Sequence, residues 1–136
     1  MTLRLNEDFP INAEGDIVLA RRLVREFALQ RGFGTMDVTR IVTAASELIR
    51  NIYVYAGTGV MRVAFNEDGA RTGMELTFSD QGPGIPDIAK AMEPGYSTGK
   101  SMGMGLSGSK RLMDDLTIRS VVGKGTTVII IKWRSK

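Results

Sequence analysis

Hydrophobic residues recur at helical spacing in two long segments of the chain. Over residues 14–31 apolar side chains return every three or four positions, and Gly32 follows where a left-handed helix cap is expected. A second, longer helix is predicted over 35–56, with Thr35 as its capping residue. A short strand is expected at 2–5, before the first helix. The first third of the chain is therefore predominantly helical.

Alternation of apolar and polar residues predicts four further strands in two hairpins. These strands cover residues 60–67, 73–80, 116–121 and 126–133. Between the hairpins, 85–92 and 105–115 favour helices, while 93–102 lacks periodicity and is expected to be a mobile loop. Strands joined as hairpins, together with helices, are typical of the α+β class. We expect a mixed, mostly antiparallel sheet with helices on one face.

Composition and length restrict the chemistry that this chain performs. Its 136 residues suit one domain, 1–136, and 43% hydrophobic with 24% charged residues is ordinary for a globular protein. The chain has no cysteine and no histidine, which excludes disulfides, thiolate chemistry and imidazole catalysis. No apolar run is long enough for a signal or a membrane span, so we expect a soluble cytoplasmic protein with no membrane partner.

The positive charge of the chain does not indicate a nucleic-acid ligand. The net charge is +3, but lysine and arginine are scattered among 15 acidic residues and are not interleaved with aromatic residues. A small basic group, Arg21, Arg22 and Arg25, is interpreted as a solvated helix face. No nucleic-acid partner is therefore expected.

A turn between the first hairpin and the following helix carries the first candidate chemistry. Asp80-Gln81-Gly82-Pro83-Gly84 follows a predicted strand, and its glycines and proline cannot continue that strand. A carboxylate is thus placed at a sheet edge, beside backbone that can approach a ligand closely. An ordinary Asp-rich turn is the alternative interpretation.

Two glycine-rich patterns resemble known nucleotide-binding motifs, but neither pattern meets the requirements of its motif. Residues 95–101 have three residues between their glycines, where a P-loop needs four. Residues 103–108 match G-x-G-x-x-G, but a loop precedes them where the dinucleotide fingerprint needs a strand. Glycines before a helix still predict an anion site for phosphate, with Lys100 nearby as a point charge. A glycine needed only for a tight turn is the alternative.

Two polar residues on the second helix form another candidate pair. Glu47 and Asn51 are four residues apart and therefore share a helix face. A carboxylate and an amide oxygen so placed suit a general base and an Mg²⁺ ligand. In the alternative interpretation, Glu47 only pairs with Arg50 or Asn51 on the helix surface.

Taken together, four motifs resemble the boxes of one superfamily, in the same order. The motifs are Glu47-Leu48-Ile49-Arg50-Asn51, Asp80-Gln81-Gly82-Pro83-Gly84, Gly103-Met104-Gly105-Leu106 and Gly125-Thr126-Thr127. This order is similar to that of the GHKL superfamily, the Bergerat-fold ATPases, whose fold is a two-layer α/β sandwich. Within it the chain resembles the small serine/threonine switch kinases of the bacterial stressosome and partner-switching pathways.

The resemblance implies a role for each motif. Asp80 would accept a hydrogen bond from the adenine amino group, Thr127 with Thr126 would complete the adenine side, and Asn51 would hold Mg²⁺. Glu47 would be the catalytic base, and Lys100 would replace the arginine that related kinases often carry in the lid, here residues 93–102. The implied nucleotide-binding residues are Asn51, Asp80, Gly82, Gly84, Ile85, Gly103, Met104, Gly105, Leu106, Thr126 and Thr127.

The resemblance also implies a function with partners. ATP and Mg²⁺ would be the cofactors, and the kinase would phosphorylate serine or threonine on STAS-domain scaffold or antagonist proteins in a stress-response pathway. When released, it would bind and activate a PP2C-type phosphatase. An anti-sigma factor kinase, a non-catalytic ATP-gated binding module and a plain ATPase are the alternatives.

Overall fold

The computed structural model describes residues 8–92 and 106–135, which form helices and the strands of one sheet. The elements are β1 (Asp8–Ile11), α1 (Glu14–Gln30), α2 (Thr35–Asn51), the π-helix η1 (Ile52–Ala56), β2 (Gly59–Asp68), β3 (Arg71–Asp80), α3 (Ile88–Ala91), α4 (Leu106–Leu112), β4 (Asp115–Val121) and β5 (Gly125–Trp133). The strand expected at 2–5 and the loop expected at 93–102 lie outside the described residues. No described helix is both long and apolar enough to cross a membrane.

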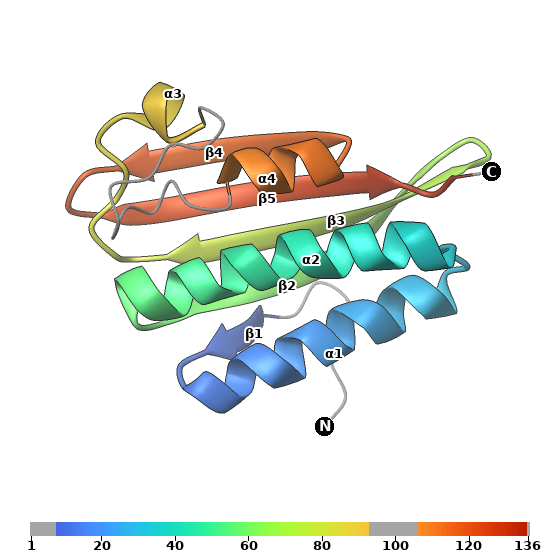
Figure 1. Ribbon diagram of the computed structural model, residues 1–136, viewed down its shortest axis with the longest axis horizontal. Coiled ribbons are helices and arrows are strands. Elements are labelled where there is room, and N and C mark those ends of the chain that lie inside the picture. The colour runs from blue at the N-terminus through green and yellow to red at the C-terminus, as the bar shows by residue number, and fades with distance from the viewer. Residues whose placement is uncertain (1–7, 93–105, 136) are drawn as a thin grey trace.

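Five strands form one sheet in the order β1-β2-β3-β5-β4. The α+β class is confirmed, and every ladder between the described strands is antiparallel, where a mixed, mostly antiparallel sheet was expected. The reason lies in the connections: β2–β3 and β4–β5 are hairpins, and the chain between them carries α3 and α4 before β5 returns antiparallel to β3. Helices α1, α2 and α4 lie on one face of this sheet (Figure 1).

Alternation along the strands divides the sheet into a helix-facing side and an outer side. On β3 Leu76 and Phe78 are buried, and on β5 Val128 and Ile130 are buried, whereas the residues between them are partly exposed. The helix-facing residues pack with the apolar stripes of α1 and α2 into one core. The apolar face of the strands, which repeats every two residues, packs against the apolar stripes of the helices, which repeat every 3.6 residues, and this packing gives the two layers.

The second helix differs from its prediction at both ends. Thr35 is the first helical residue, and Gly34 is the capping residue, without a side-chain cap. The Thr35 carbonyl instead accepts a hydrogen bond from the Thr39 hydroxyl at 3.0 Å. The predicted continuation to residue 56 is present as the π-helix η1, which ends at Gly57 in a left-handed conformation with φ of 84°.

Boundaries elsewhere were misplaced by a few residues. A strand at 8–11 was not predicted, because Pro10 was interpreted as a strand terminator; β1 is an edge strand, where a missing N–H is tolerated. Helix α3 is shorter than the predicted 85–92, since the Ile85 N–H donates to the Ser120 hydroxyl at 2.7 Å instead. Helix α4 stops at Leu112, and β4 begins at Asp115.

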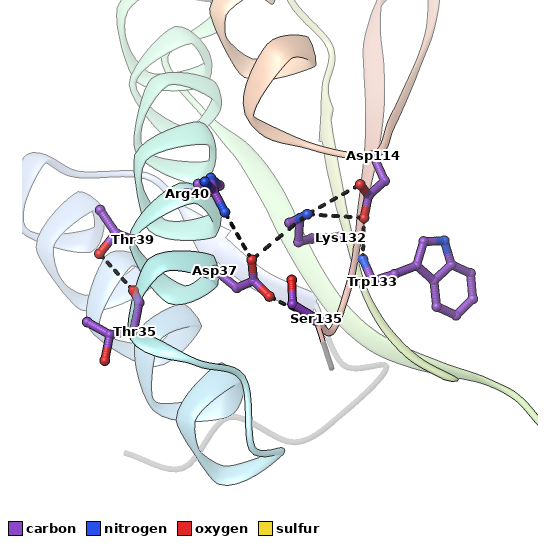
Figure 2. Close-up of polar contacts among 8 residues, drawn as sticks. All are labelled: Thr35, Asp37, Thr39, Arg40, Asp114, Lys132, Trp133 and Ser135. Carbon is purple, nitrogen blue, oxygen red and sulfur yellow. Dashed lines mark hydrogen bonds and ion pairs between the residues drawn. The ribbon is translucent and has the colours of Figure 1, made fainter. Parts of the chain in front are cut away.

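A cluster of charged side chains ties the start of α2 to the end of β5 and to β4 (Figure 2). Asp37 is buried, accepts a hydrogen bond from the Ser135 N–H at 3.0 Å, and pairs with Arg40 at 3.3 Å and Lys132 at 3.9 Å. Lys132 also pairs with Asp114 at 3.3 Å. Burial alone would raise the pKa of Asp37, but the Ser135 hydrogen bonds and the nearby cations outweigh it, so the pKa is lowered.

Candidate nucleotide site

Asp80, the last residue of β3, lines a small cavity between the sheet and α2. It pairs across the sheet with Thr126 on β5. The cavity has a volume of about 20 Å³ and is lined by Leu48, Asn51, Ile52, Phe78, Asp80, Ile85, Leu106, Thr126 and Val128. That volume suits about one water molecule. A nucleotide base would therefore sit at the mouth of the cavity or displace a lining side chain.

The Asp80 carboxylate is held in place by the backbone that surrounds it. Its Oδ1 accepts a hydrogen bond from the Gly82 N–H at 2.9 Å. Burial raises the pKa of Asp80, and the hydrogen bonds from the backbone N–H groups of Gly82 and Thr126 offset only part of that rise. A half-buried carboxylate against apolar side chains is a strong acceptor for one further N–H donor.

The glycines after Asp80 allow the turn to pack between two other elements. A Cβ on Gly82 would lie 2.7 Å from the Ala56 Cβ at the end of η1. Gly84 has φ of 79°, and a Cβ there would lie 2.6 Å from the Val121 carbonyl oxygen. The Gly123 N–H in the β4–β5 turn donates to the Pro83 carbonyl at 2.9 Å. The turn is therefore fixed on both sides, and both glycines are required there for steric reasons.

Glu47 and Asn51 lie one helical turn apart at the end of α2. Asn51 is 9% exposed and lines the cavity with Asp80, whereas Glu47 is exposed. Within the described ranges, Glu47 forms no ion pair with Arg50, so that part of the surface-pairing alternative is not present. The predicted base and the predicted amide thus lie at the same end of the site.

The donor set fits a magnesium ion shared with a substrate. Among the described residues, no three acidic side chains gather to hold a metal ion by themselves. Asn51 offers one amide oxygen at the cavity, and Mg²⁺ is commonly held by one or two protein oxygens together with substrate phosphates and water. Asn51 would therefore hold the ion only when phosphates are bound.

The two threonines of the last motif lie on opposite faces of β5. Thr126 is 4% exposed, lines the cavity, and shares a hydrogen bond with the Ser120 hydroxyl at 2.9 Å. Thr127 faces the outer side, where its hydroxyl lies 3.3 Å from that of Ser79. The structure thus brings Thr126 to Asp80, and it turns Thr127 away from the cavity.

Ser120 and the apolar wall of the cavity did not emerge from the motifs. Ser120 accepts the Ile85 N–H and bonds to Thr126, so it links the turn to β5. Its signal was the alternation of β4, in which Leu116, Ile118 and Ser120 share the helix-facing side. Alternation along β3 likewise places Phe78 on the same side of the sheet as Asp80. Leu48, Ile52 and Val128 complete the wall.

The phosphate end of the predicted site is described only from Leu106 onward. Leu106 begins α4, is 2% exposed and lines the cavity. Helix α4 is held against α2 by the Ser109 hydroxyl, which donates to the Ala44 carbonyl at 3.4 Å. Lys100, Gly103, Met104 and Gly105, which the sequence analysis also assigned to this site, lie outside the described residues.

This fold and these motifs are those of a known class of ATPase domains. Residues 9–132 match the family described as the histidine kinase-like ATPase domain. The chain belongs to this family, and the expected relationship to the GHKL superfamily is confirmed. A particular relative is the serine/threonine-protein kinase RsbT of Bacillus subtilis, which is 52% identical over 123 residues, or 90% of this chain and 92% of that protein.

Other relatives include anti-sigma factors and the domains of histidine kinases. The anti-sigma F factor of Geobacillus stearothermophilus is 34% identical over 121 residues, which are 83% of this chain and 81% of that protein. The catalytic domain of histidine kinase ThkA has a TM-score of 0.54 at 15% identity, covering 96% of this chain and 99% of that one. The mycobacterial sensor histidine kinase MprB also has a TM-score of 0.54, at 17% identity, covering 96% and 98%. At these identities the two structures show the fold alone.

Proposed function

We propose that this chain is an ATP-dependent serine/threonine protein kinase. The observation that carries the proposal is that buried Asn51 lines the cavity of Asp80, whereas Glu47, one helical turn earlier on α2, is exposed. A carboxylate open to solvent can meet a hydroxyl on another protein, whereas the buried residues can face the nucleotide. The identity with a serine/threonine-protein kinase supports the same activity.

Recognition of adenine is assigned to Asp80, with Thr126 beside it. The Asp80 carboxylate would accept a hydrogen bond from the adenine amino group, and such a charge-assisted bond contributes about 1.5–3 kcal/mol. A base without that donor would leave the carboxylate unpaired. Gly82 and Gly84 would hold the turn that positions Asp80 against the base, and Ile85 and Leu106 would contribute apolar contacts from the cavity wall.

Phosphoryl transfer is assigned to Glu47, with Asn51 as the magnesium ligand. Bound Mg²⁺ would neutralise charge on the phosphates. Glu47 would accept the proton of the attacking hydroxyl. The hydroxyl oxygen would bond to the γ-phosphorus as the bond between that phosphorus and the ADP oxygen breaks. Lys100, Gly103, Met104 and Gly105 stay predicted phosphate contacts. Thr127 faces away from the cavity and is left out of this scheme.

The phosphoryl acceptor is not an imidazole of this chain. The chain contains no histidine, so it cannot phosphorylate a histidine of its own. We place the acceptor serine or threonine on a STAS-domain protein of a partner-switching pathway in the cytoplasm. In this proposal the released kinase then binds and activates a PP2C-type phosphatase. The partner-switching kinases that the motifs resemble and the anti-sigma relatives support this choice of pathway.

Labelled ATP tests the proposal directly. The protein is incubated with γ-labelled ATP, Mg²⁺ and a STAS-domain protein from the same organism, and label is expected on serine or threonine of that protein. Glu47→Gln should slow transfer by about 10²–10⁴-fold at unchanged Mg·ATP affinity. Glu14→Gln, an exposed glutamate in the first turn of α1, is the matched control and should transfer normally.

Three outcomes would contradict the proposal in different ways. Near-normal transfer by Glu47→Gln removes Glu47 as the base. Phosphate released without any partner indicates an ATPase. ATP binding without turnover, accompanied by changed affinity for a sigma factor, indicates the binding role suggested by the anti-sigma relatives.

A further inference from the structure

A second cavity lies on the outer side of the sheet, away from the helices. Its volume is about 470 Å³, which is in the range of small-molecule sites. It is located where β1 and β3 end and where β2 and β5 begin. Its polar lining residues are Asn12, Thr58, Ser79, Gln81 and Thr127. Helices α1, α2 and α4 lie on the other face of the sheet (Figure 1), so none of these helices covers the cavity.

The strand register places four of the lining residues in one row across the outer side. Val60 pairs with Pro10 on one neighbouring strand and with Ser79 on the other. Thr127 pairs with Ser79 and with Arg119 on β4, which continues the row to the edge of the sheet. Residues paired in this way face the same side, and two strand spacings put Ser79 and Arg119 about 10 Å apart at the backbone. Ser79, Thr127 and Arg119 are called the outer row below.

A further cavity adds positive charge at one end of the outer row. It has a volume of about 240 Å³, shares Asp80 and Thr127 with the larger cavity, and is also lined by Arg119 and Lys124. Both cations are exposed, and neither forms an ion pair with another described residue. Asp80 is the one acid in the two linings, and alternation along β3 directs its side chain to the helix-facing side. Two unpaired cations at one end therefore suit an anionic group.

The larger cavity contains hydrogen-bonding groups with capacity for a ligand. The Ser79 hydroxyl lies 3.3 Å from that of Thr127, so one donates to the other and the second keeps its proton for a ligand. Gln81 is exposed, and its amide makes no hydrogen bond within the described ranges. Neither lining contains an aromatic residue on which a nucleic-acid base could stack. These groups therefore suit a ligand body rich in hydroxyl groups better than they suit a base.

We propose that the outer row binds a small sugar phosphate, at a site separate from the candidate nucleotide site. The phosphate pairs with Arg119 and Lys124, whose two charges match a phosphate group carrying about −1.5 to −2 at pH 7. The sugar lies over the larger cavity, where its hydroxyls exchange hydrogen bonds with Ser79, Thr127 and Gln81. Mg·ATP on the helix-facing side leaves this site open, and binding there does not depend on the proposed kinase activity.

Ribose 5-phosphate is the probe that tests the site. Isotope-labelled protein is first saturated with Mg·ATP, so that the phosphate end of the nucleotide site is occupied. The probe should then shift the backbone amide signals of Ser79, Thr127 and Arg119 in NMR spectra, whereas the signals of α1 and α2 stay in place. Calorimetry should show that ribose 5-phosphate binds about tenfold tighter than inorganic phosphate, because the sugar adds hydrogen bonds. Ribose alone should not bind measurably.

Two kinds of variant separate the phosphate contacts from the sugar contacts. Arg119→Gln should raise the Kd for ribose 5-phosphate about tenfold, because it removes a charge-assisted hydrogen bond. Ser79→Ala/Thr127→Val should also raise that Kd about tenfold, but should leave the Kd for inorganic phosphate unchanged. The matched controls, Arg71→Gln and Thr77→Val, lie on the outer side of β3 outside both cavities and should change neither constant. Thermal melting checks that each variant is folded.

Three results would overturn this inference. Loss of ribose 5-phosphate binding in saturating Mg·ATP would show that the probe occupies the nucleotide site instead. An unchanged Kd in Arg119→Gln would remove the outer row as the anion site. Equal affinities for ribose 5-phosphate and inorganic phosphate would show that the sugar is not recognised. Failure of the kinase proposal would be seen separately, as ATP that does not bind or is not used for transfer, while the NMR shifts in the outer row still decide the sugar phosphate site.

Discussion

At the scale of single residues, Asp80 combines two opposing influences. Burial against Phe78 and Ile85 disfavours its charge, and the N–H groups of Gly82 and Thr126 favour it. Because the first influence is larger, the pKa is raised and the ionised side chain is under-solvated in the empty protein. An additional N–H donor from a ligand would restore part of the lost hydration. The Asp80 carboxylate therefore favours binding of a ligand N–H group, but it lowers the stability of the folded protein.

Replacing Asp80 by asparagine should separate these two effects. The raised pKa means that the folded protein binds this proton more readily than the unfolded chain, so the wild type loses stability as pH rises from about 3.9 through the raised pKa. Asp80→Asn does not lose stability as this proton dissociates, so at pH 7 it should melt at the same temperature as the wild type or higher. ATP should no longer raise the melting temperature of the variant. Melting from pH 4 to pH 8, with and without Mg·ATP, measures both. A lower melting temperature at pH 7, or retained ATP stabilisation, would contradict this assignment.

At the scale of elements, the π-helix η1 supports the turn that carries Asp80. Its last residue, Ala56, contacts Gly82, and its first, Ile52, lines the cavity and would contact a Cβ on Gly59 at 2.7 Å. The wider turn of a π-helix changes the direction of the side chains that follow α2. The end of α2 and the end of β3 are therefore positioned by one short element between them.

A methyl group at Gly82 should disturb this contact. Gly82→Ala places a Cβ 2.7 Å from the Ala56 Cβ, so either the turn or η1 must shift, at a cost of about 1–3 kcal/mol in unfolding free energy. We expect weaker ATP binding as Asp80 moves with the turn. The measurements are urea unfolding and isothermal titration with Mg·ATP.

The contact itself can be tested by removing the other methyl group. Gly82→Ala/Ala56→Gly should bind ATP more tightly than Gly82→Ala alone, which a double-mutant cycle would show as a coupling energy. Gly15→Ala is the control, because nothing lies within 4 Å of its new Cβ in the first turn of α1. Equal effects of the two single alanine substitutions would show that the contact with Ala56 is unimportant.

The charged cluster at the start of α2 fixes the helix that carries Glu47 and Asn51. Asp37 receives the Ser135 N–H and lies between Arg40 and Lys132. Arg134 adds a second link, because its guanidinium donates to the Arg31 carbonyl at 2.6 Å. The end of the chain is therefore attached to the α1–α2 connection, and both attachments lie at the end of α2 away from Asn51.

Asp37→Asn should destabilise the protein in a pH-dependent way. The lowered pKa of Asp37 means that its contribution is present above the ordinary carboxyl pKa of about 3.9 and is lost as pH falls through the lowered value. At pH 7 we expect a loss of about 1.5–3 kcal/mol, the range for hydrogen bonds to charged groups. Urea unfolding of wild type and variant at pH 7, 5 and 3 measures it. A difference that does not narrow toward pH 3 would show that the charge of Asp37 is not responsible.

At the scale of the whole molecule, the sequence predicted the helices and strands better than it predicted which of them lie next to each other. Period-two and period-3.6 patterns located both hairpins and both long helices, and the motifs located Asp80 and Asn51. The motifs did not show which of Thr126 and Thr127 faces the cavity, because the side that each one faces depends on the register of β5 against β3. They also missed β1, since only the position of Pro10 at a sheet edge makes that strand acceptable.

A hollow lined by Val18, Arg21, Arg22, Arg25 and Val42 shows another limit of the sequence. The spacing of the three arginines on α1 was visible, but Val42 comes from α2 and lines the same hollow only because the two helices pack side by side. A pattern within one helix describes a face, whereas a groove needs the second helix. Surfaces of this kind can be found only once the packing of the layers is known.

The β3–β5 ladder also determines when the nucleotide site can form during folding. Asp80 and Thr126 face each other only after strands far apart in the sequence have paired, with α3 and α4 in the chain between them. Closing such a long connection is slow compared with forming the β2–β3 or β4–β5 hairpin. A chain with both hairpins and the described helices would still lack the proposed adenine pocket, so we expect ATP binding to recover only after β3 and β5 have paired.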